Sequence, residues 1–390
     1  MYKQGKLYAF AATGFLYSLI VVDLYRKLVG TNVESIRNVV YIFFFTLLLW
    51  DMYKSKHLKT MLTIVGVMLG LFIFSILLNP GYSEVYTSSV VLFISRLWPA
   101  YYIGRYTEDW NRLSKFVLLF SPIALVYAVS LFVIPDIAGG EAYATIASNL
   151  AFVSLISLFA SIYYKKIIGL PIAVVCLIPV FFYGTRAFFL GVIISLFLAY
   201  IINTNNKKVL LLSIFAVIVV IFLTIGDTIF DQLYRWFPDS RTLKMMAIGD
   251  FMDDSNRSHF YKRLINYLED HPLSMCGLIG DRIYLCPIGT TSEILSNFSH
   301  NCCLELCMNF GLPLGILLNI FFLSKLIKSI KLSFRSQYTI NYIFMLILGA
   351  GFLDMMVSAS YMGSYIPWLL FGLAFSICKP NISIIKTNNK

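Results

Sequence analysis

The chain has 390 residues, of which 59% are hydrophobic and only 13% are charged, and its mean hydropathy is +0.78. Soluble globular proteins are roughly half apolar and about a quarter charged, so this composition excludes that class and indicates a chain solvated mainly by lipid. The formal net charge of +11 suggests a nucleic-acid partner, an idea that the placement of the charges excludes.

The predicted elements are apolar stretches of about 20 residues, the length that an α-helix needs to cross a bilayer. The first follows a short basic segment and has no small-residue cleavage site after it, so we expect a retained helix rather than a removed signal peptide. The sequence predicts an all-α polytopic membrane protein of about twelve transmembrane helices. In chain order they are 7–24, 37–53, 60–78, 86–104, 116–135, 143–164, 167–184, 187–203, 208–226, 307–324, 339–359 and 363–378.

Basic residues alternate between the two sides of these predicted helices. Most of the 31 lysines and arginines fall in every second connecting segment, whereas the opposite short loops hold only Arg26, Lys27, Arg37 and Arg186. Positive charge marks the cytoplasmic side, so we expect both termini in the cytoplasm and the long loop outside. The charge is then a topology signal and implies no nucleic acid. The cytoplasmic set is Lys3, Lys6, Lys54, Lys56, Lys59, Arg105, Arg112, Lys115, Lys165, Lys166, Lys207, Lys208, Lys325, Lys328, Lys331, Arg335, Lys379, Lys386 and Lys390.

The chain divides into helices one to nine (1–226), a large external loop (227–299), helices ten to twelve (300–380) and a cytoplasmic tail (381–390). The loop carries ten acidic and seven basic residues, so it is no simple polycation. Long loops held at one face of a scaffold tend to carry function. Cys276 and Cys286 share this loop and can form a disulfide in an oxidising compartment, which the sequence leaves open.

Within the loop, residues 255–270 are predicted to form an amphipathic helix. Asp254 or Ser255 is the candidate N-cap, and His271-Pro272 ends the helix. Arg257 falls in the first turn, with Tyr261 and Leu264 along the same face. The apolar stripe consists of Phe260, Leu264, Tyr267 and Leu268.

Four features suggest chemistry at the external face. They are Gly184-Thr185-Arg186, Arg257, Gly280-Asp281-Arg282, and Ser299-His300-Asn301 followed by Leu304-Glu305 and Phe310-Gly311. Guanidinium groups bind phosphate oxygens through paired hydrogen bonds and stabilise a pyrophosphate leaving group without a metal. An imidazole accepts a proton near neutrality, as activation of a sugar hydroxyl requires.

Each of these residues also has a plain structural reading. Arg186 suits an interfacial side chain whose charge reaches the headgroups, Arg257 and Arg282 suit solvated loop charges, and His300 suits a helix cap. Glu305 lies about 140° from His300 on an ideal helix, so it is no obvious partner unless the helix begins after His300. Asp281 is a candidate anchor for Arg282.

Two charged residues fall inside predicted spans. Arg96 in the fourth span and Asp354 in the eleventh are costly in hydrocarbon and should face protein or a water-filled cavity. They either serve a substrate cleft or pair with polar groups that hold the bundle together, and we favour pairing.

A metal site is an alternative for the last motif. His300, Cys303 and Cys307 share one face if the segment is helical, which is a metal-ligand geometry. Cysteine is also a common small buried residue, and no fourth ligand is evident. We therefore expect neither a metal nor a cofactor.

In order and spacing, these motifs resemble the O-antigen polymerase and O-antigen ligase superfamily. The resemblance covers 184–316 in motifs and the whole chain in topology. It departs from the family pattern in the looser turn after Pro272 and at Cys302 and Cys303. The matching elements are Gly184-Thr185-Arg186-Ala187, Asn256-Arg257, Tyr261, His271-Pro272-Leu273, Gly280-Asp281-Arg282, Ser299-His300-Asn301, Leu304-Glu305 and Phe310-Gly311.

The resemblance implies a fold similar to class C glycosyltransferases, which lack a nucleotide-sugar domain and take the donor from a polyprenyl pyrophosphate. It implies that Arg186 and Arg257, with Arg282, hold the pyrophosphate and that His300 assists the acceptor hydroxyl. We add Glu305, Tyr261, Asn301 and Arg96 as expected substrate-binding residues. The expected partners are undecaprenyl-pyrophosphate-linked oligosaccharides, membrane lipid, a chain-length regulator and a flippase.

The predicted function is polymerisation of lipid-linked repeat units of O-antigen or capsule on the outer face of the inner membrane. A ligase that transfers polymer to lipid A-core would use the same arginines and histidine, and the Gly-Asp-Arg and His-Asn-x-x-Leu-Glu pattern favours the polymerase. A transporter or flippase would also suit twelve spans and the intramembrane charges. The large loop and the absence of a repeat between the halves argue against it.

Overall fold

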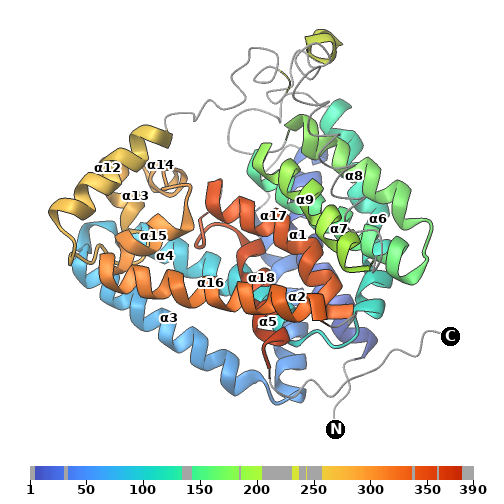
Figure 1. Cartoon of the computed structure of the whole chain (residues 1–390), viewed down its shortest axis with the longest axis horizontal. Helices are drawn as coiled ribbons and strands as arrows, with labels where there is room; N and C mark the ends of the chain where they lie inside the picture. Colours follow the sequence, from blue (N-terminus) through green and yellow to red (C-terminus); the bar gives the residue numbers. More distant parts are fainter. Residues whose placement is uncertain are drawn as a thin grey trace.

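The computed structural model describes residues 5–29, 34–133, 143–183, 186–203, 231–236, 243, 257–335, 339–357 and 360–379. All regular secondary structure in these ranges is helical (Figure 1). Five helices are long and apolar enough to cross a membrane, and four shorter apolar helices accompany them. This part of the chain is therefore an all-α, multi-pass membrane protein, as the sequence predicts.

Eleven of the twelve predicted spans overlap described helices, two of them with a break, and 208–226 lies outside the described residues. The number of twelve spans stays a prediction. The helices are α1 (Lys6–Val29), α2 (Glu34–Lys54), α3 (Leu58–Leu78), α4 (Ser83–Leu92), α5 (Trp98–Tyr106), α6 (Trp110–Val133), α7 (Tyr143–Tyr164), α8 (Gly169–Tyr183), α9 (Arg186–Asn203), α12 (Arg257–Asp270), α13 (Gly280–Leu285), α14 (Thr291–Ser296), α15 (Cys302–Phe310), α16 (Leu312–Arg335), α17 (Thr339–Val357) and α18 (Tyr365–Ile377).

The fourth predicted span, 86–104, is not one regular helix. A π-helical turn, η2 (Phe93–Leu97), separates α4 from α5. The Trp98 N–H bonds to the Phe93 carbonyl, five residues back, and Pro99 follows with no N–H to continue the α-helical ladder. Arg96 lies within this widened turn, a geometry that is frequent at functional sites.

The start of α1 and the ends of α2, α5 and α18 lie at one end of the bundle. The hydroxyls of Tyr8 and Thr107 are 2.5 Å apart, and Tyr102 donates to the Asp51 carboxylate at 2.6 Å. The Lys379 ammonium lies 4.6 Å from the centroid of the Tyr106 ring. The two described ends of the chain therefore share one side of the molecule.

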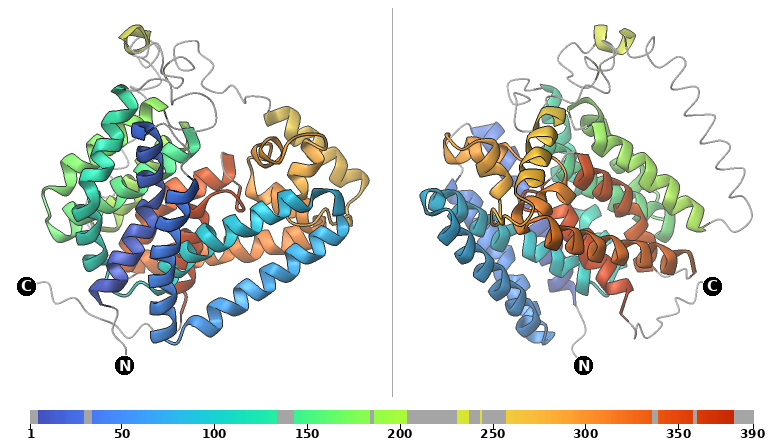
Figure 2. Two further views of the ribbon diagram at one scale, coloured as in Figure 1. Left: turned by 180° about the vertical axis from the view of Figure 1, so that it is seen from behind. Right: turned by 60° about the vertical axis from the view of Figure 1, so that its left-hand side comes forward.

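The part of the loop that contains α12–α14 lies at the opposite end. With 21 residues, α3 spans about 31 Å along its axis, and Figure 2 shows it running to the end that carries these helices. There the Ser75 hydroxyl accepts from the Leu278 N–H at 2.8 Å, and the Asn79 amide donates to the Cys276 carbonyl at 2.9 Å. Loop and chain ends thus lie on opposite sides, which is what the predicted topology requires; which side faces the cytoplasm stays a prediction.

Close helix crossings hold the bundle together. A Cβ at Gly191 of α9 would lie 2.6 Å from the Ala350 Cα, and one at Gly349 of α17 would lie 2.6 Å from the Gly191 carbonyl oxygen. The Ser195 hydroxyl also accepts from the Ala350 N–H at 2.9 Å. Small residues let membrane helices approach this closely, and van der Waals contact then holds them.

The tenth predicted span, 307–324, is wrong in its position. Helix α15 ends at Phe310, Gly311 has a φ of +76°, and α16 then continues to Arg335. Glycine adopts this left-handed conformation readily, so the chain turns between the two helices. The basic residues from Lys325 to Arg335 therefore lie on a helix and not in a connecting loop.

Candidate functional site

The predicted amphipathic helix of the loop is confirmed as α12. It ends at Asp270 as predicted, and its N-cap candidates Asp254 and Ser255 lie outside the described residues. Leu264 and Leu268 are buried on α13 and α15 against Leu285 and Met308, with Phe260 and Tyr267 packed at the edge. The apolar stripe thus fixes α12 on α15, the helix that follows His300.

This packing places one face of α12 beside His300. The Tyr261 hydroxyl donates a long hydrogen bond, 3.5 Å, to the His300 carbonyl. Arg257 lies one turn earlier on the same face, about 6 Å along the helix axis. Tyr261 therefore contacts the His300 turn, and Arg257 lies one turn along α12 from that contact; the convergence of Arg257 with His300 stays a prediction.

His300 sits in a strained turn that is held from both sides. Its φ of +52° is in the left-handed region, which few residues other than glycine adopt without a local energetic penalty. Before it, the Ser299 N–H donates to the Asp281 carboxylate at 3.0 Å. After it, the Asn301 side-chain oxygen accepts from the Cys303 and Leu304 N–H groups at 2.9 and 3.1 Å and caps α15. Strain at a position fixed in this way is typical of functional residues.

Behind this turn lies a buried polar network. The Arg282 guanidinium donates to the Ser360 hydroxyl at 2.5 Å and to the Leu295 carbonyl at 3.1 Å. Ser360 in turn donates to the Glu305 carboxylate at 2.5 Å, whose other oxygen accepts from the Tyr361 N–H at 3.0 Å. The network joins α13, α15 and the segment after α17.

The charges in this network do not balance if all groups ionise. Arg282 and Glu305 form an ion pair at 3.9 Å with side chains only 3% and 0% exposed, and Asp281 is buried beside them. Burial and the nearby Asp281 charge raise the pKa of Glu305 to about 8, although Arg282 opposes the shift. Burial raises the pKa of Asp281 as well, again against Arg282. Two acids share one guanidinium, so the trio retains a proton at neutral pH.

Arg282 and Glu305 face inward in this structure. The guanidinium of Arg282 lies 5.5 Å from the centroid of the Phe298 ring, and the same ring lies 4.0 Å from the centroid of the His300 imidazole. These contacts position the His300 turn, and direct contact of either residue with substrate stays a prediction. The helix begins at Cys302, after His300, so the 140° separation expected on an ideal helix does not apply.

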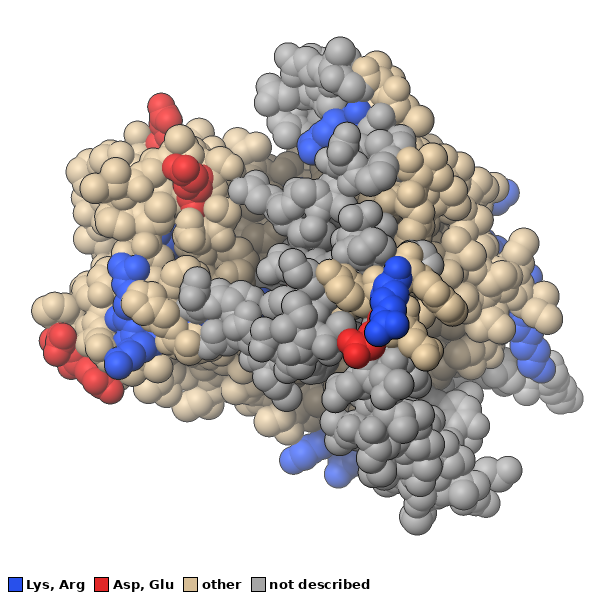
Figure 3. Space-filling model, turned by 90° about the horizontal axis from the view of Figure 1, so that it is seen from above, with Lys and Arg blue, Asp and Glu red and all other residues tan. Residues whose placement is uncertain are grey.

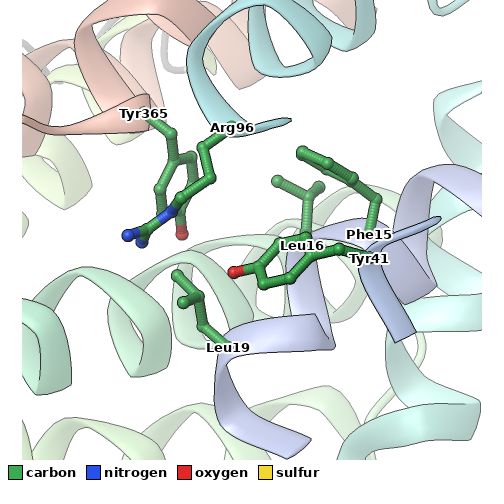
Figure 4. Close-up of a pocket in the computed structure, with 6 residues that line it drawn as sticks. All are labelled: Phe15, Leu16, Leu19, Tyr41, Arg96 and Tyr365. Atoms are coloured by element: carbon green, nitrogen blue, oxygen red, sulfur yellow. The ribbon is translucent and has the colours of Figure 1, made fainter. Parts of the chain in front are cut away.

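Arg96 belongs to a different part of the molecule. It lines a small cavity with residues from α1, α2 and α18, and Figure 4 shows its guanidinium beside the hydroxyl end of Tyr365. Asp354 accepts from the Ser364 hydroxyl at 3.4 Å, and no ion pair joins it to Arg96 within the described ranges. Asp354 thus pairs with a hydroxyl, as the favoured interpretation expects. Arg96 has no carboxylate in ion-pair contact among the described residues. The other lining residues are Phe15, Leu16, Leu19 and Tyr41.

The structure describes the backbone of Arg186 at the start of α9 but not its side chain, and Gly184 and Thr185 lie outside the described residues. The tight crossing of α9 on α17 fixes the helix that follows Arg186. Helix α17 leads in turn to Ser360. The predicted convergence of Arg186 with His300 stays a prediction.

The premise of the metal alternative is not met. His300 precedes α15 and so does not share a helical face with Cys303 and Cys307. Among the described residues, no three His, Cys, Asp or Glu side chains are placed to hold a metal. Cys276 and Cys286 are free thiols: the first contacts the Tyr267 hydroxyl and the second the Ile288 carbonyl.

Sequence reasoning missed Ser360, Phe298 and Asn309. The Asn309 side chain accepts from the Gly280 N–H at 3.0 Å and donates to the Tyr361 hydroxyl at 2.7 Å. The signal for this part of the network was the polar Ser-Tyr pair at 360–361, between two apolar spans. Seen from above the view of Figure 1, the charges of the described residues are scattered over the surface with no continuous basic patch (Figure 3).

The family model for O-antigen ligases matches residues 171–319 of the chain. The match supports the resemblance of the chain to the O-antigen polymerase and ligase superfamily. Members of this superfamily are glycosyltransferase-like enzymes. No curated protein matches the chain.

The superfamily match covers all the elements around the His300 turn. It includes Arg186, Arg257, Arg282, His300 and Glu305, and it ends within α16. Arg96, Asp354 and Ser360 lie outside it. The part of the chain that is typical of the superfamily is therefore the part in which α12 packs against α15.

Proposed function

We propose that the protein is a polymerase that joins undecaprenyl-pyrophosphate-linked oligosaccharides of O-antigen or capsule at the outer face of the bacterial inner membrane. The observation that supports it is the packing of α12 on α15, which brings Tyr261 into contact with the strained His300 turn; Arg257 lies one turn earlier on the same helix. A permanent cation would stabilise the leaving diphosphate, and an imidazole would accept the proton of the incoming hydroxyl.

The proposed reaction is a direct displacement. A terminal hydroxyl oxygen of one lipid-linked chain forms a bond to the anomeric carbon of another, and the bond from that carbon to the pyrophosphate breaks. The His300 imidazole takes the hydroxyl proton, and Arg186 and Arg257 stabilise the departing undecaprenyl pyrophosphate. The anomeric configuration inverts, and no covalent enzyme intermediate forms.

In this proposal Arg282 and Glu305 act through the His300 turn. Arg282 binds Ser360 and Leu295, and its neighbour Asp281 holds the Ser299 N–H. In this proposal Arg282 and Glu305 are therefore positioning residues. We assign Tyr261 and Asn301 to the acceptor side. Arg96 lies in a different part of the molecule, in the small cavity between α1 and α18, and its contact with substrate stays a prediction.

The proposal is tested by Arg257→Ala, with Lys262→Ala as the matched control. Lys262 is an exposed cation on the same helix, so its loss changes the charge equally without touching the face that carries Tyr261. We expect Arg257→Ala to reduce glycan lengthening at least a hundred-fold, since removing one transition-state donor costs about that much in rate. The measurement is the length of lipid-linked glycan made by purified protein in liposomes without a gradient or nucleotide.

Normal long glycan from Arg257→Ala would refute the role assigned to Arg257. An equal loss of lengthening in both variants would show that the charge of the loop in general, and not Arg257 itself, is what matters. Lengthening by the parent protein under these conditions would exclude a transporter.

Ligation to lipid A-core is the second candidate, because the matched family model is the one for O-antigen ligases. Deletion of the gene distinguishes the two. Loss of a polymerase leaves single repeat units attached to the outer-membrane lipid, whereas loss of a ligase leaves none attached.

A further inference from the structure

Three cations from separate segments meet at the end of the bundle opposite α12–α14. The Arg105 guanidinium at the end of α5 and the Lys325 ammonium on α16 lie 5.5 and 5.8 Å from the centroid of the Phe375 ring. Arg105 and Lys379 lie 6.0 and 4.6 Å from the centroid of the Tyr106 ring. Arg105 thus shares one aromatic ring with each of the two lysines.

These cations have no carboxylate in ion-pair contact within the described ranges. One terminal nitrogen of Arg105, Nη1, is buried with no hydrogen-bond partner among the described residues. Glu108 and Asp51 are the acids whose charges reach the cluster, the first at Lys379 and the second at His57.

The positive charges of this cluster repel one another. Burial, followed by the charge of Arg105, lowers the pKa of Lys379. Burial, followed by the charge of Lys379, lowers the pKa of His57, which stacks on Tyr106. The cluster thus has excess positive charge.

The last turns of α16 extend this positive surface. Leu326, Ser329 and Ser333 are buried on the inner side of the helix. Lys325 is half-buried against Phe375 of α18, whereas Lys328, Lys331 and Arg335 are exposed on the outer side. Large apolar side chains on the same helix are also exposed, among them Phe321, Ile327 and Phe334. Basic groups beside exposed apolar ones match a headgroup above acyl chains.

Helix dipoles account for part of this arrangement only. Arg105 and Lys379 lie at or just beyond the C-terminal turns of α5 and α18, where partial negative charge favours cations. Lys325 lies within α16, and the buried nitrogen of Arg105 lacks an acceptor. A ligand with several anionic oxygens would supply what the helix ends do not.

We propose that Arg105, Lys325 and Lys379 bind the phosphate group of an anionic ligand, with an anionic phospholipid in the adjoining leaflet as the favoured source. The guanidinium forms paired hydrogen bonds with two phosphate oxygens, and the ammonium groups supply point charges. In the predicted topology this is the cytoplasmic leaflet. The site is on the far side from His300 and does not depend on the proposed function.

The test uses the full-length protein in neutral detergent and counts bound lipid by native mass spectrometry. Phosphatidylglycerol is compared with phosphatidylcholine for the parent chain, Lys325→Gln, Lys379→Gln and Lys115→Gln. Lys115 is an exposed cation of α6 outside the cluster, so it controls for net charge. A basic residue near anionic lipid contributes about 1 kcal/mol, so we expect each cluster variant to bind phosphatidylglycerol about five-fold more weakly.

Sodium phosphate titrated into the same samples distinguishes the two sources. Preference for phosphatidylglycerol, lost in Lys325→Gln and Lys379→Gln and kept in Lys115→Gln, supports the lipid. If inorganic phosphate stabilises the parent chain and Lys115→Gln but not Lys325→Gln or Lys379→Gln, and no lipid is preferred, the result supports a soluble phosphate. If the three variants behave alike with both probes, the proposal is overturned.

Discussion

At the residue scale, the central feature is a proton held by buried acids. Glu305 has no exposed surface, and Asp281 and Arg282 lie beside it. Among the described residues, Arg282 is the one cation beside these two carboxyl groups, so we expect one acid to stay protonated in the folded state at neutral pH. The sequence indicated Asp281 as an anchor for Arg282. It could not indicate that Asp281 holds the Ser299 N–H, because that bond depends on how α13 packs against α15.

This proton makes stability depend on pH. The pKa of Glu305 is about 8 in the folded protein and 4.5 as the reference, so the folded state binds a proton that the unfolded state has lost in this window. Stability therefore falls as pH rises from about 5 to 8, by up to about 1.4 kcal/mol per unit. We expect Glu305→Gln to flatten this dependence in thermal unfolding measurements.

The control is Glu293→Gln, an exposed acid in the capping box of α14. Hydrogen bonds from Thr290 lower the pKa of Glu293, so its contribution is lost only as the solution becomes acidic. An unchanged slope between pH 5 and 8 in Glu305→Gln would contradict the assignment of the proton to this network.

At the scale of elements, hydropathy predicted where helices occur but not where they break. The α15–α16 boundary depends on the left-handed Gly311, and the π-turn that holds Arg96 precedes Pro99. The hydropathy of an apolar run reveals neither break. The amphipathic helix of the loop was predictable because its apolar stripe and its Pro272 terminator are local. Its partner α15 was not, because that contact joins residues far apart in sequence.

The crossing of α9 and α17 gives a prediction at this scale. In Gly349→Val the Cβ would lie 2.6 Å from the Gly191 carbonyl oxygen, and neither backbone can move without separating the helices. We expect a lower melting temperature together with loss of glycan lengthening. Gly66→Ala is the control, because a Cβ there meets nothing within 4 Å; if both variants melt alike, the crossing does not stabilise the bundle.

At the scale of the whole molecule, the loop and the described chain ends occupy opposite sides. Charge alternation predicted this arrangement because lysines and arginines are retained on the cytoplasmic side during insertion. The sequence did not reveal how the loop attaches, since the bonds from Ser75 and Asn79 to 276–278 join α3 to a distant segment.

Sidedness is tested by labelling with a membrane-impermeant maleimide. Ile288 is 92% exposed in the loop, and Lys56 lies exposed between α2 and α3. We expect Ile288→Cys to react in intact spheroplasts and Lys56→Cys to react only after permeabilisation, each above the background of the parent chain. The reverse pattern would invert the predicted topology.

The attachment of the loop to α3 has a mechanical consequence. Much of α3 faces outward, including Leu62 and Leu77, so a thinner or thicker bilayer would change its tilt. Its far end holds Leu278, and the adjacent Cys276 and Gly277 bond to the backbone of α15 at 3.2 and 3.1 Å. Tilting would thus act on the C-terminal end of α15, the helix that follows the His300 turn. In liposomes of graded acyl length, the rate of glycan lengthening should peak where the hydrocarbon thickness matches about 31 Å of helix. The protein would then respond to the thickness of its membrane.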